Sequence, residues 1–344
     1  MGSLQNPRIR WGTLEEYQEL WRSARVRCPY ATPGWLQALA HTYGFPLRFA
    51  LWDQGAVPFV VVPGRWGRGP RRWVSLPFSD RSGVIRPHTT GPLHLLPEEF
   101  QALKHALQRQ GLVWELRNLA LPDPAETPPT YENFTLLLDP SVPPEKGFKS
   151  TIKRNVKKAR KSGVEIHRFR HLEALWVFYR LFAQTHQRHG VPVQPWRWFV
   201  NLWRFVVLPG EGFLSLALYQ GRAIAGALFL QDGETVVYKY GATDYRYQRL
   251  RPNDLLFHEE ILRAWHRGYR FFDLGRVGPN EEGLREYKKK WGAKALPLYY
   301  HSSREGWQTP AETSRLYAWA TGWLQRAPVG TLRWLGDTLY AYFA

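Results

Sequence analysis

Apolar positions recur with helical and strand periods through the first 120 residues. Residues 10–45 carry two helical patterns, one beginning after Thr13 as a cap and one opened by Pro33. Extended segments and an amphipathic helix follow. The expected strands are Phe45–Trp52, Val57–Val62, Arg72–Leu76 and Val113–Asn118, and the expected helix is Glu98–Gln110. This part of the chain is therefore predicted to mix α and β structure.

The pattern after residue 148 begins with a helix that is apolar on one face and basic on the others. Its apolar positions are 152, 156 and 159, with Ser150 or Thr151 as the cap and Gly163 at the end. The next elements include a three-stranded meander and a helix closed by Gly268. Helices are expected at 172–189, 196–205 and 253–267, and strands at 214–219, 223–230, 235–240 and 269–274. This order indicates an α/β or α+β fold rather than a helix bundle.

Two proline-rich stretches, 121–130 and 139–145, flank one more expected strand at Asn133–Leu138. The length of 344 residues is about twice that of a usual domain. We therefore expect an N-terminal domain over residues 1–130, a linker region over 131–148 and a C-terminal domain over 149–344. A weak internal repeat supports a duplication, because Ala50-Leu51-Trp52 and Val57 recur at one constant offset as Ala217-Leu218-Tyr219 and Ile224.

The formal net charge of +18 favours an anionic partner such as a polyphosphate, a nucleic acid or an anionic surface. The chain contains 35 arginines but only 12 lysines, and ten of these lysines lie in residues 146–161 and 288–294. Two interpretations remain open. Either the lysines coat solvated helix faces by chance, or both windows line one surface that binds an anionic ligand.

Several function classes lose support. The single Cys28 excludes an intramolecular disulfide and any cysteine-rich metal site. His186 and His189 lack a carboxylate at ligand spacing, so no metal is expected. The Gly-x-Ser-x-Gly, Walker and Gly-x-Gly-x-x-Gly motifs are absent, which disfavours hydrolases, P-loop enzymes and dinucleotide oxidoreductases. Without a secretory signal or an apolar run of ~18 residues, a cytoplasmic protein is expected.

Residues 238–276 resemble the core of the acetyltransferase superfamily related to Gcn5, with a strand, a loop, a helix, Gly268 and a strand in this order. In that superfamily a Gln/Arg-x-x-Gly-x-Gly/Ala loop brings backbone N–H groups to a pyrophosphate. The corresponding loop here, Gln248–Asn253, lacks the glycines, and Pro252 removes one donor. A conventional coenzyme A cradle is therefore not expected.

Five segments in order resemble the Fem family of non-ribosomal peptidoglycan aminoacyltransferases, which take an amino acid from aminoacyl-tRNA and add it to the stem peptide of a cell-wall precursor. These segments are Lys149–Gly163, Thr185–Gly190, Leu250–Asp254, Phe272–Arg276 and Gly283–Gly292. The resemblance implies an α/β (α+β) fold with two tandem acetyltransferase-like domains, each a mixed, mainly antiparallel sheet flanked by helices. No insertion for a coiled-coil arm is visible, so the chain resembles an armless member.

The resemblance also assigns roles to single residues. The aromatic–lysine pair of the family falls on Tyr287 and Lys288, where the lysine faces the reacting ester and a fixed cation would stabilise an oxyanion. Arg188 matches the position that grips the precursor phosphate. The family's precursor-binding lysine in the N-terminal domain has no counterpart, because no lysine precedes Lys104. Further candidates for the substrate cleft, each equally compatible with a structural role, are Tyr238, Tyr240, Asp273 and Arg276.

The basic helix is the expected contact to the tRNA backbone, since the chain has no acid between Glu145 and Glu165. The expected tRNA-binding residues are Lys153, Arg154, Lys157, Lys158, Lys161, Lys289 and Lys290. The implied function is transfer from aminoacyl-tRNA to a side-chain amine of a lipid-linked or nucleotide-linked peptidoglycan precursor, by a monomer without a metal or other cofactor. The alternatives are an N-acyltransferase of the same fold that uses acyl-CoA, and a non-catalytic RNA-binding protein.

The C-terminal run Thr313–Ala344 places several tryptophans among arginines. Packing against the domain is the favoured expectation. The alternative is a peripheral contact with the inner face of the plasma membrane, which a lipid-linked acceptor would favour.

Overall fold

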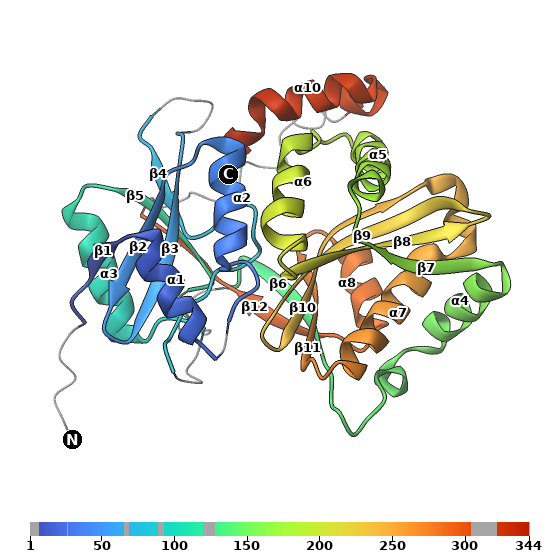
Figure 1. Ribbon diagram of the computed structural model, residues 1–344, viewed down its shortest axis with the longest axis horizontal. Helices are drawn as coiled ribbons and strands as arrows, with labels where there is room; N and C mark the ends of the chain where they lie inside the picture. The colour runs from blue at the N-terminus through green and yellow to red at the C-terminus, as the bar shows by residue number, and fades with distance from the viewer. Residues whose placement is uncertain are drawn as a thin grey trace. The chain divides into compact units, whose positions relative to one another are not determined.

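The computed structural model describes residues 7–25, 27–64, 69–88, 93–119, 121, 128–303 and 322–343. The chain divides into two compact units (Figure 1). The first comprises Met1–Asn133, Leu296–Trp307 and Ala341–Ala344, and the second comprises Phe134–Ala295 and Gln308–Tyr340. The chain thus returns to the first unit after completing most of the second. Within the described residues no helix is long and apolar enough to cross a membrane.

The first unit is built on a six-stranded sheet of order β1-β2-β3-β4-β5-β13. All its strand pairs are antiparallel except the parallel pair of β4 and β5. The element bounds are β1 Arg10–Gly12, α1 Leu14–Ser23, α2 Pro33–Tyr43, β2 Leu47–Trp52, β3 Gly55–Val62, β4 Arg72–Val74, α3 Pro97–Arg109, β5 Val113–Arg117 and β13 Tyr300–Ser302. This order gives a mixed, mainly antiparallel sheet.

The helix starts of the first unit follow from local chemistry. The Thr13 side chain accepts from the Glu16 backbone N–H, while the Glu16 carboxylate accepts from the Thr13 backbone N–H, so the two residues form a capping box. Thr32 caps α2 through its side chain, with Pro33 as the first helical residue. Residues 10–12, which belonged to the expected helical region, form a strand instead, because Trp11 pairs with Ala50 of β2.

The second unit contains most of a seven-stranded sheet of order β12-β6-β11-β10-β9-β8-β7. Strands β7 to β10 are antiparallel neighbours, and β10 and β11 are parallel. The strands are β6 Tyr131–Leu137, β7 Val164–Phe169, β8 Gly212–Tyr219, β9 Arg222–Asp232, β10 Thr235–Thr243, β11 Phe271–Val277 and β12 Lys294–Leu298. The helices are α4 Ser150–Lys161, α5 Leu172–His189, α6 Trp196–Leu202, α7 Pro252–His266, α8 Glu282–Lys289 and α10 Val329–Leu339. Shorter helical turns are Pro144–Gly147, Trp203–Val207 and Tyr245–Leu250, and a further turn, Tyr340–Phe343, belongs mostly to the first unit.

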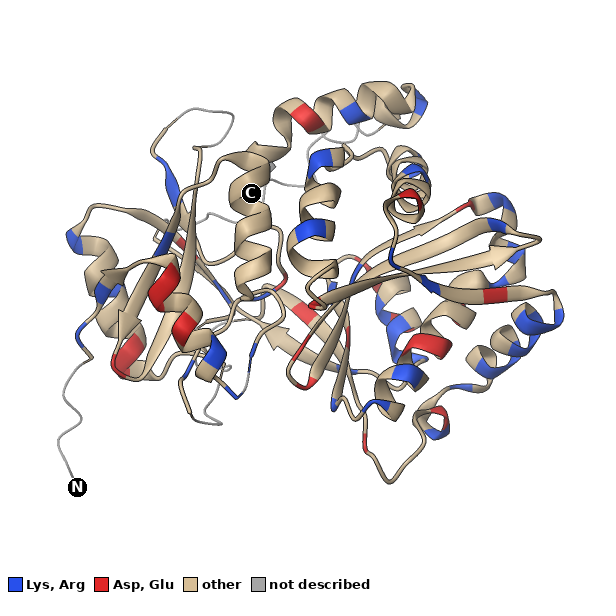
Figure 2. Cartoon of the chain, viewed as in Figure 1, with Lys and Arg blue, Asp and Glu red and all other residues tan. Residues whose placement is uncertain are grey.

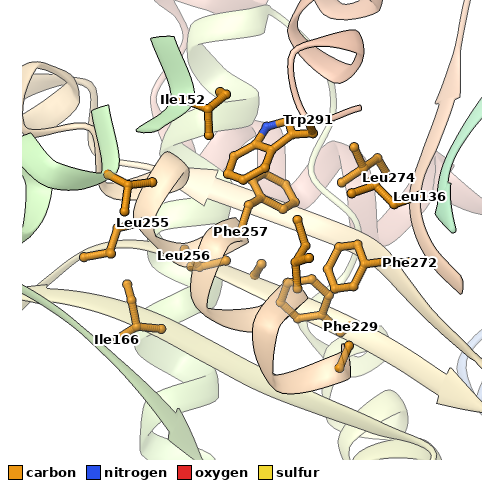
Figure 3. Packing of buried hydrophobic residues seen from close by; sticks show 14 of the residues in the cluster. Leu136, Ile152, Ile166, Phe229, Leu255, Leu256, Phe257, Phe272, Leu274 and Trp291 are labelled. Carbon is orange, nitrogen blue, oxygen red and sulfur yellow. The ribbon is translucent and has the colours of Figure 1, made fainter. Parts of the chain in front are cut away.

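One apolar core joins the sheet of the second unit to α4, α7 and the segment after α8 (Figure 3). Helix α4 contributes Ile152, which is 1% exposed, and the chain beyond α8 contributes Trp291, also 1% exposed. The side chain of Phe257 on α7 packs against Trp291, with ring centroids 5.9 Å apart. The apolar stripe read from the sequence of α4 is thus the face that enters the core.

The repeated segment of the sequence forms equivalent hairpins in the two units. Strands β2 and β3 pair antiparallel, as do β8 and β9. The second hairpin has an irregularity at Ala217–Leu218, where Ala217 faces Ala225 but Leu218 faces Ala223. Ile224 is therefore skipped in the pairing with β8, whereas its counterpart Val57 pairs with Ala50.

Three sequence expectations in the second unit need correction. Helix α4 begins at Ser150 with Lys149 in the capping position, and no side chain caps it. The helix expected at 196–205 ends at Leu202 and continues as a wider turn at Trp203–Val207. Strand β7 and helix α8 were not expected from the sequence. The first is a short strand at the edge of the sheet, and the second is a short helix composed mostly of charged residues.

Candidate active site

The strands β10 and β11 separate at the centre of the second unit. They pair only over Thr235–Val237 and Phe271–Asp273, and β10 continues to Thr243 without this partner. An irregularity between Tyr238 and Tyr240 bends β10 where the pairing ends. Side chains near the diverging ends therefore have space that a continuous sheet would close.

Lys288 lies against the diverging end of β11. It is 5% exposed, and its Nζ donates to the backbone carbonyls of Gly275 at 2.8 Å and Arg276 at 2.9 Å. The Phe134 ring centroid lies 6.0 Å from the same Nζ. Helix α8 thus holds one lysine side chain inside the fold, at the diverging end of β11.

Tyr287, the preceding residue, reaches a different element. Its hydroxyl donates to Oδ1 of Asp254 at 3.0 Å, and Nδ2 of Asn155 donates to Oδ2 of the same carboxyl at 2.9 Å. Burial raises the pKa of Asp254 above its ordinary value, and burial together with the neighbouring Asp254 raises the pKa of Tyr287 well above 10. The three side chains connect α8, α7 and α4.

The first turn of α7 carries its own acid. Arg251 precedes the helix with φ of +60°, Pro252 is the first helical residue, and Asp254 follows in the first turn with 5% exposure. A second acid, Asp244, is also 5% exposed at the start of the preceding loop, where Arg246 donates to it at 2.6 Å. Asp254 therefore places a protein carboxyl at the positive end of α7, while Asp244 is bound to Arg246.

The outer faces of α4 are basic (Figure 2). Five exposed cations on this helix form no ion pair within the described residues, and we call them the basic face: Lys153, Arg154, Lys157, Lys158 and Lys161. Arg160 differs, because it pairs with Glu259 of α7 at 2.7 Å. A hydrogen bond from His258 and the Arg160 ion pair lower the pKa of Glu259 to about 2.

The residues after Lys288 connect α8 to α4. The backbone carbonyl of Lys290 accepts from the backbone N–H of Lys149, directly before α4. Lys289 is half-exposed and pairs with Glu286 at 2.8 Å, and Lys290 is exposed. Both residues thus lie next to the helix that bears the basic face, although Lys289 already has an acidic partner.

The remaining predicted residues fall into two groups. Asp273 and Arg276 lie on β11 close to Lys288, and the Asp273 carboxylate accepts from the Gly275 backbone N–H at 2.7 Å. Tyr238 packs against Phe257 of the core, with ring centroids 4.8 Å apart.

The second group faces α5 and α6. The hydroxyl of Tyr240 accepts from Trp198 Nε1 at 3.0 Å. The exposed Arg188 lies at the end of α5, and its guanidinium lies 4.8 Å from the Tyr245 ring. The structure therefore brings Asp273, Arg276 and Lys288 together, whereas Tyr240 contacts α6 and Arg188 lies at the end of α5.

Asp254, Asn155 and Glu259 were not singled out from the sequence. Asp254 is the one acid in the Leu250–Asp254 segment, and Asn155 is the one uncharged polar residue between Ile152 and Val156. Two signals in the sequence could have pointed to these residues. One is an isolated acid in the first turn of a helix, and the other is an isolated amide in a basic helix. Within the described part of the chain, no three histidine, cysteine or acidic side chains come close enough to hold a metal ion.

Residues 146–289 match the model of the acetyltransferase (GNAT) domain family. No curated protein matches the sequence. The solved structure of FemX is similar, at 13% identity and a TM-score of 0.62, covering 86% of this chain and 96% of that one.

Two further solved structures are similar. The C-terminal domain of a putative lysylphosphatidylglycerol synthetase from Agrobacterium fabrum is 12% identical with a TM-score of 0.58, covering 85% of this chain and 93% of that one. A tandem GNAT protein from the clavulanic acid biosynthesis pathway is 11% identical with a TM-score of 0.50, covering 87% and 99%. Residues 146–289 therefore match a GNAT domain, and the chain shares its fold with FemX and with the tandem GNAT protein.

Proposed function

We propose that this protein transfers an aminoacyl group from aminoacyl-tRNA to a side-chain amine in the stem peptide of a peptidoglycan precursor. The observation that carries the proposal is the position of the basic face. Five cations on α4 form no ion pair with any residue that the structure describes. This helix is tied through Asn155 to Asp254 and through Asp254 to Tyr287, directly before Lys288. A polyanion bound along α4 would thus lie next to the helices that carry the candidate catalytic pair.

The basic face fits the phosphate backbone of RNA. Contacts from lysine and arginine to phosphates are largely independent of sequence and weaken with salt. The cations are exposed, and the acids near them, Glu259 and Glu145, are already bound to Arg160 and His258. This face therefore has no acidic competitor for phosphate within the described residues.

The start of α7 argues against the coenzyme A alternative. A pyrophosphate at a helix N-terminus needs bare N–H groups and a positive field. Here Pro252 lacks an N–H, and the carboxylates of Asp254 and Asp244 occupy the first turn and the preceding loop. A second anion at this place would face repulsion from Asp254 in its ionised form.

The chemistry requires one tetrahedral intermediate. The acceptor amine attacks the ester carbonyl, the carbonyl oxygen gains negative charge, and the bond to the terminal tRNA hydroxyl then breaks. The proton lost by the amine ends on that hydroxyl. Lys288 supplies a fixed cation in a low-dielectric site, where stabilisation of an oxyanion is strong. No covalent intermediate with the protein is needed.

For the acceptor, Arg188 is the proposed contact to a precursor phosphate, since its guanidinium is exposed at the end of α5. A phosphate is present whether the precursor is linked to a lipid or to a nucleotide. The five segments that resemble the Fem family motivate this acceptor class without specifying the amino acid that is added.

The proposal is tested with purified protein and cell-wall precursor, offered labelled aminoacyl-tRNA in one reaction and labelled acetyl-CoA in another. Label that reaches the precursor only from tRNA supports the proposal. Label that moves only from acetyl-CoA would replace it with an N-acyltransferase. RNA binding with no transfer from either donor would leave a non-catalytic RNA-binding protein.

A further inference from the structure

Three exposed tryptophans of the described residues lie on α5, on α10 and in the helical turn between them in the packing of the second unit. Of the large apolar side chains that are exposed, the three tryptophans are Trp176 on α5, Trp323 in the helical turn before α10, and Trp334 on α10. Their exposed fractions are 36%, 50% and 63%. Leu172 and Val177 of α5 are exposed beside Trp176. Single exposed apolar residues need no explanation, but such a concentration does.

Helix α10 is firmly docked, so this exposure is not that of a detached helix. It lies next to α5 (Figure 1). Leu332 and Gly336 are buried, and a Cβ at Gly336 would lie 1.6 Å from the carbonyl oxygen of Val193. The segment before α10 is also held, because Nε2 of Gln187 donates to the Ala327 carbonyl at 2.7 Å. The favoured expectation of packing is thus met for the described residues 322–343, while Trp319 and Arg315 lie outside them.

Cations are interleaved with these tryptophans. The guanidinium of Arg333 lies 5.2 Å from the Trp176 ring and 5.3 Å from the Tyr179 ring, which joins the α5 and α10 parts of the surface. Arg326 is exposed between Trp323 and α10, and Arg180 is exposed one turn after Trp176. The nearby acids are Glu173 and Asp337. We call Trp176, Trp323, Trp334, Arg326 and Arg333 the aromatic face.

We propose that the aromatic face binds the surface of an anionic lipid bilayer. Tryptophan rings favour the headgroup level of a membrane, because one edge is apolar and the indole N–H is polar. Arginines placed among them pair with lipid phosphates, and the net charge of +18 adds attraction to an anionic leaflet. The contact is peripheral.

A bilayer fits this face better than a protein partner does. Polar residues separate the tryptophans, with Gln325 between Trp323 and α10 and Thr338 one turn after Trp334, and both are exposed. Such spacing suits tryptophan rings that each enter a lipid interface separately. The centre of a protein interface, in contrast, is a contiguous apolar surface that excludes water. The proposal is independent of the proposed transferase activity.

The test measures binding of the full-length protein to vesicles of phosphatidylcholine and of an equimolar mixture with phosphatidylglycerol. Co-sedimentation and a blue shift of tryptophan emission are expected with the mixture and not with phosphatidylcholine alone. The double variant Trp323→Ser/Trp334→Ser should reduce the partition coefficient roughly tenfold or more, since two large apolar side chains no longer enter the lipid interface. Leu137→Ser is the matched control, because Leu137 is 62% exposed on β6, and it should bind as the parent does.

Three outcomes would overturn the proposal. The parent could fail to bind anionic vesicles, or the tryptophan variant could bind as well as the parent. If the tryptophan variant binds as well as the parent but Lys157→Glu/Lys158→Glu does not bind, the lipid contact would be assigned to α4. A change of oligomeric state in the tryptophan variant, measured by analytical ultracentrifugation without a change in vesicle binding, would assign the face to a protein contact.

Discussion

The hydroxyl of Tyr287 and the carboxyl of Asp254 form a hydrogen bond of 3.0 Å between the helices α8 and α7. The next residue, Lys288, points to another element and donates to carbonyls of β11. Adjacent residues of α8 therefore fix the helix in two directions, as expected when successive side chains lie about 100° apart around a helix axis. Removal of Tyr287 would loosen the helix that positions Lys288.

Replacement of Asp254 by asparagine should change how stability depends on pH. Burial raises the folded-state pKa of Asp254, so the folded protein takes up this proton at higher pH than the unfolded chain does. The parent should gain free energy of unfolding relative to Asp254→Asn as the pH falls from 7 toward about 4, the ordinary pKa of aspartate. Urea unfolding of both proteins across this range measures the difference. A difference that shrinks on acidification would mean that the pKa is lowered instead.

Replacement of Lys288 should abolish most of the proposed transfer. Lys288→Met keeps the volume of the side chain but removes the cation, and Lys288→Ala removes both, so transfer should fall roughly tenfold or more in each. Initial rates with aminoacyl-tRNA measure this effect, with circular dichroism as the check on folding. Glu282→Gln, an exposed change on the same helix, serves as the control. Rates near the parent value in a folded Lys288→Met protein would remove the catalytic role from this residue.

Charge reversal on the basic face should weaken RNA binding in a salt-dependent manner. Lys157→Glu/Lys158→Glu removes two exposed cations, so the slope of log affinity against log salt should fall by about one for each phosphate that these side chains bind in the parent. Titration of tRNA at several salt concentrations measures the slope. Arg48→Glu/Arg109→Glu changes the net charge equally with two exposed residues of the first unit and should leave the slope intact. Equal slopes for both variants would mean that α4 is an ordinary solvated helix that does not bind RNA.

Gly336→Ala should release α10 from the loop that follows α5. The added methyl group would meet the Val193 carbonyl, a backbone atom that cannot turn away. Hydrogen exchange of the α10 amides should therefore accelerate, while the strands of the second unit keep their protection. Gly330→Ala on the same helix is the matched control, because nothing lies within 4 Å of its added Cβ. Unchanged exchange in Gly336→Ala would show that the packing yields without detaching the helix.

Much of the second unit was predictable because its signals are local. The periodic apolar residues of α4 and the hairpin turn at Gln220-Gly221 specify their elements without help from distant residues, and α5 has the predicted bounds. Strand β7 was not predicted because residues 164–167 alternate over only four positions, and pairing with β8 extends the strand to Phe169. The start of α4 was misplaced by one or two residues, since the polar residues at 149–151 do not distinguish among possible caps.

The sequence by itself determined the mixed α/β class, the repeated hairpin and the concentration of lysines in two windows, because periodicity, turns and charge are properties of neighbouring residues. Only the tertiary structure decided what those lysines do. It left the cations of the basic face unpaired within the described residues, paired Arg160 with Glu259, and buried Lys288 against two carbonyls of β11. It also buried Asp254 in the first turn of α7 and joined it by hydrogen bonds to Asn155 and Tyr287, which are 99 and 33 positions away in the sequence. The burial of a side chain and the identity of its ion-pair and hydrogen-bond partners depend on residues that meet only after the chain has folded. Local sequence patterns therefore cannot predict them.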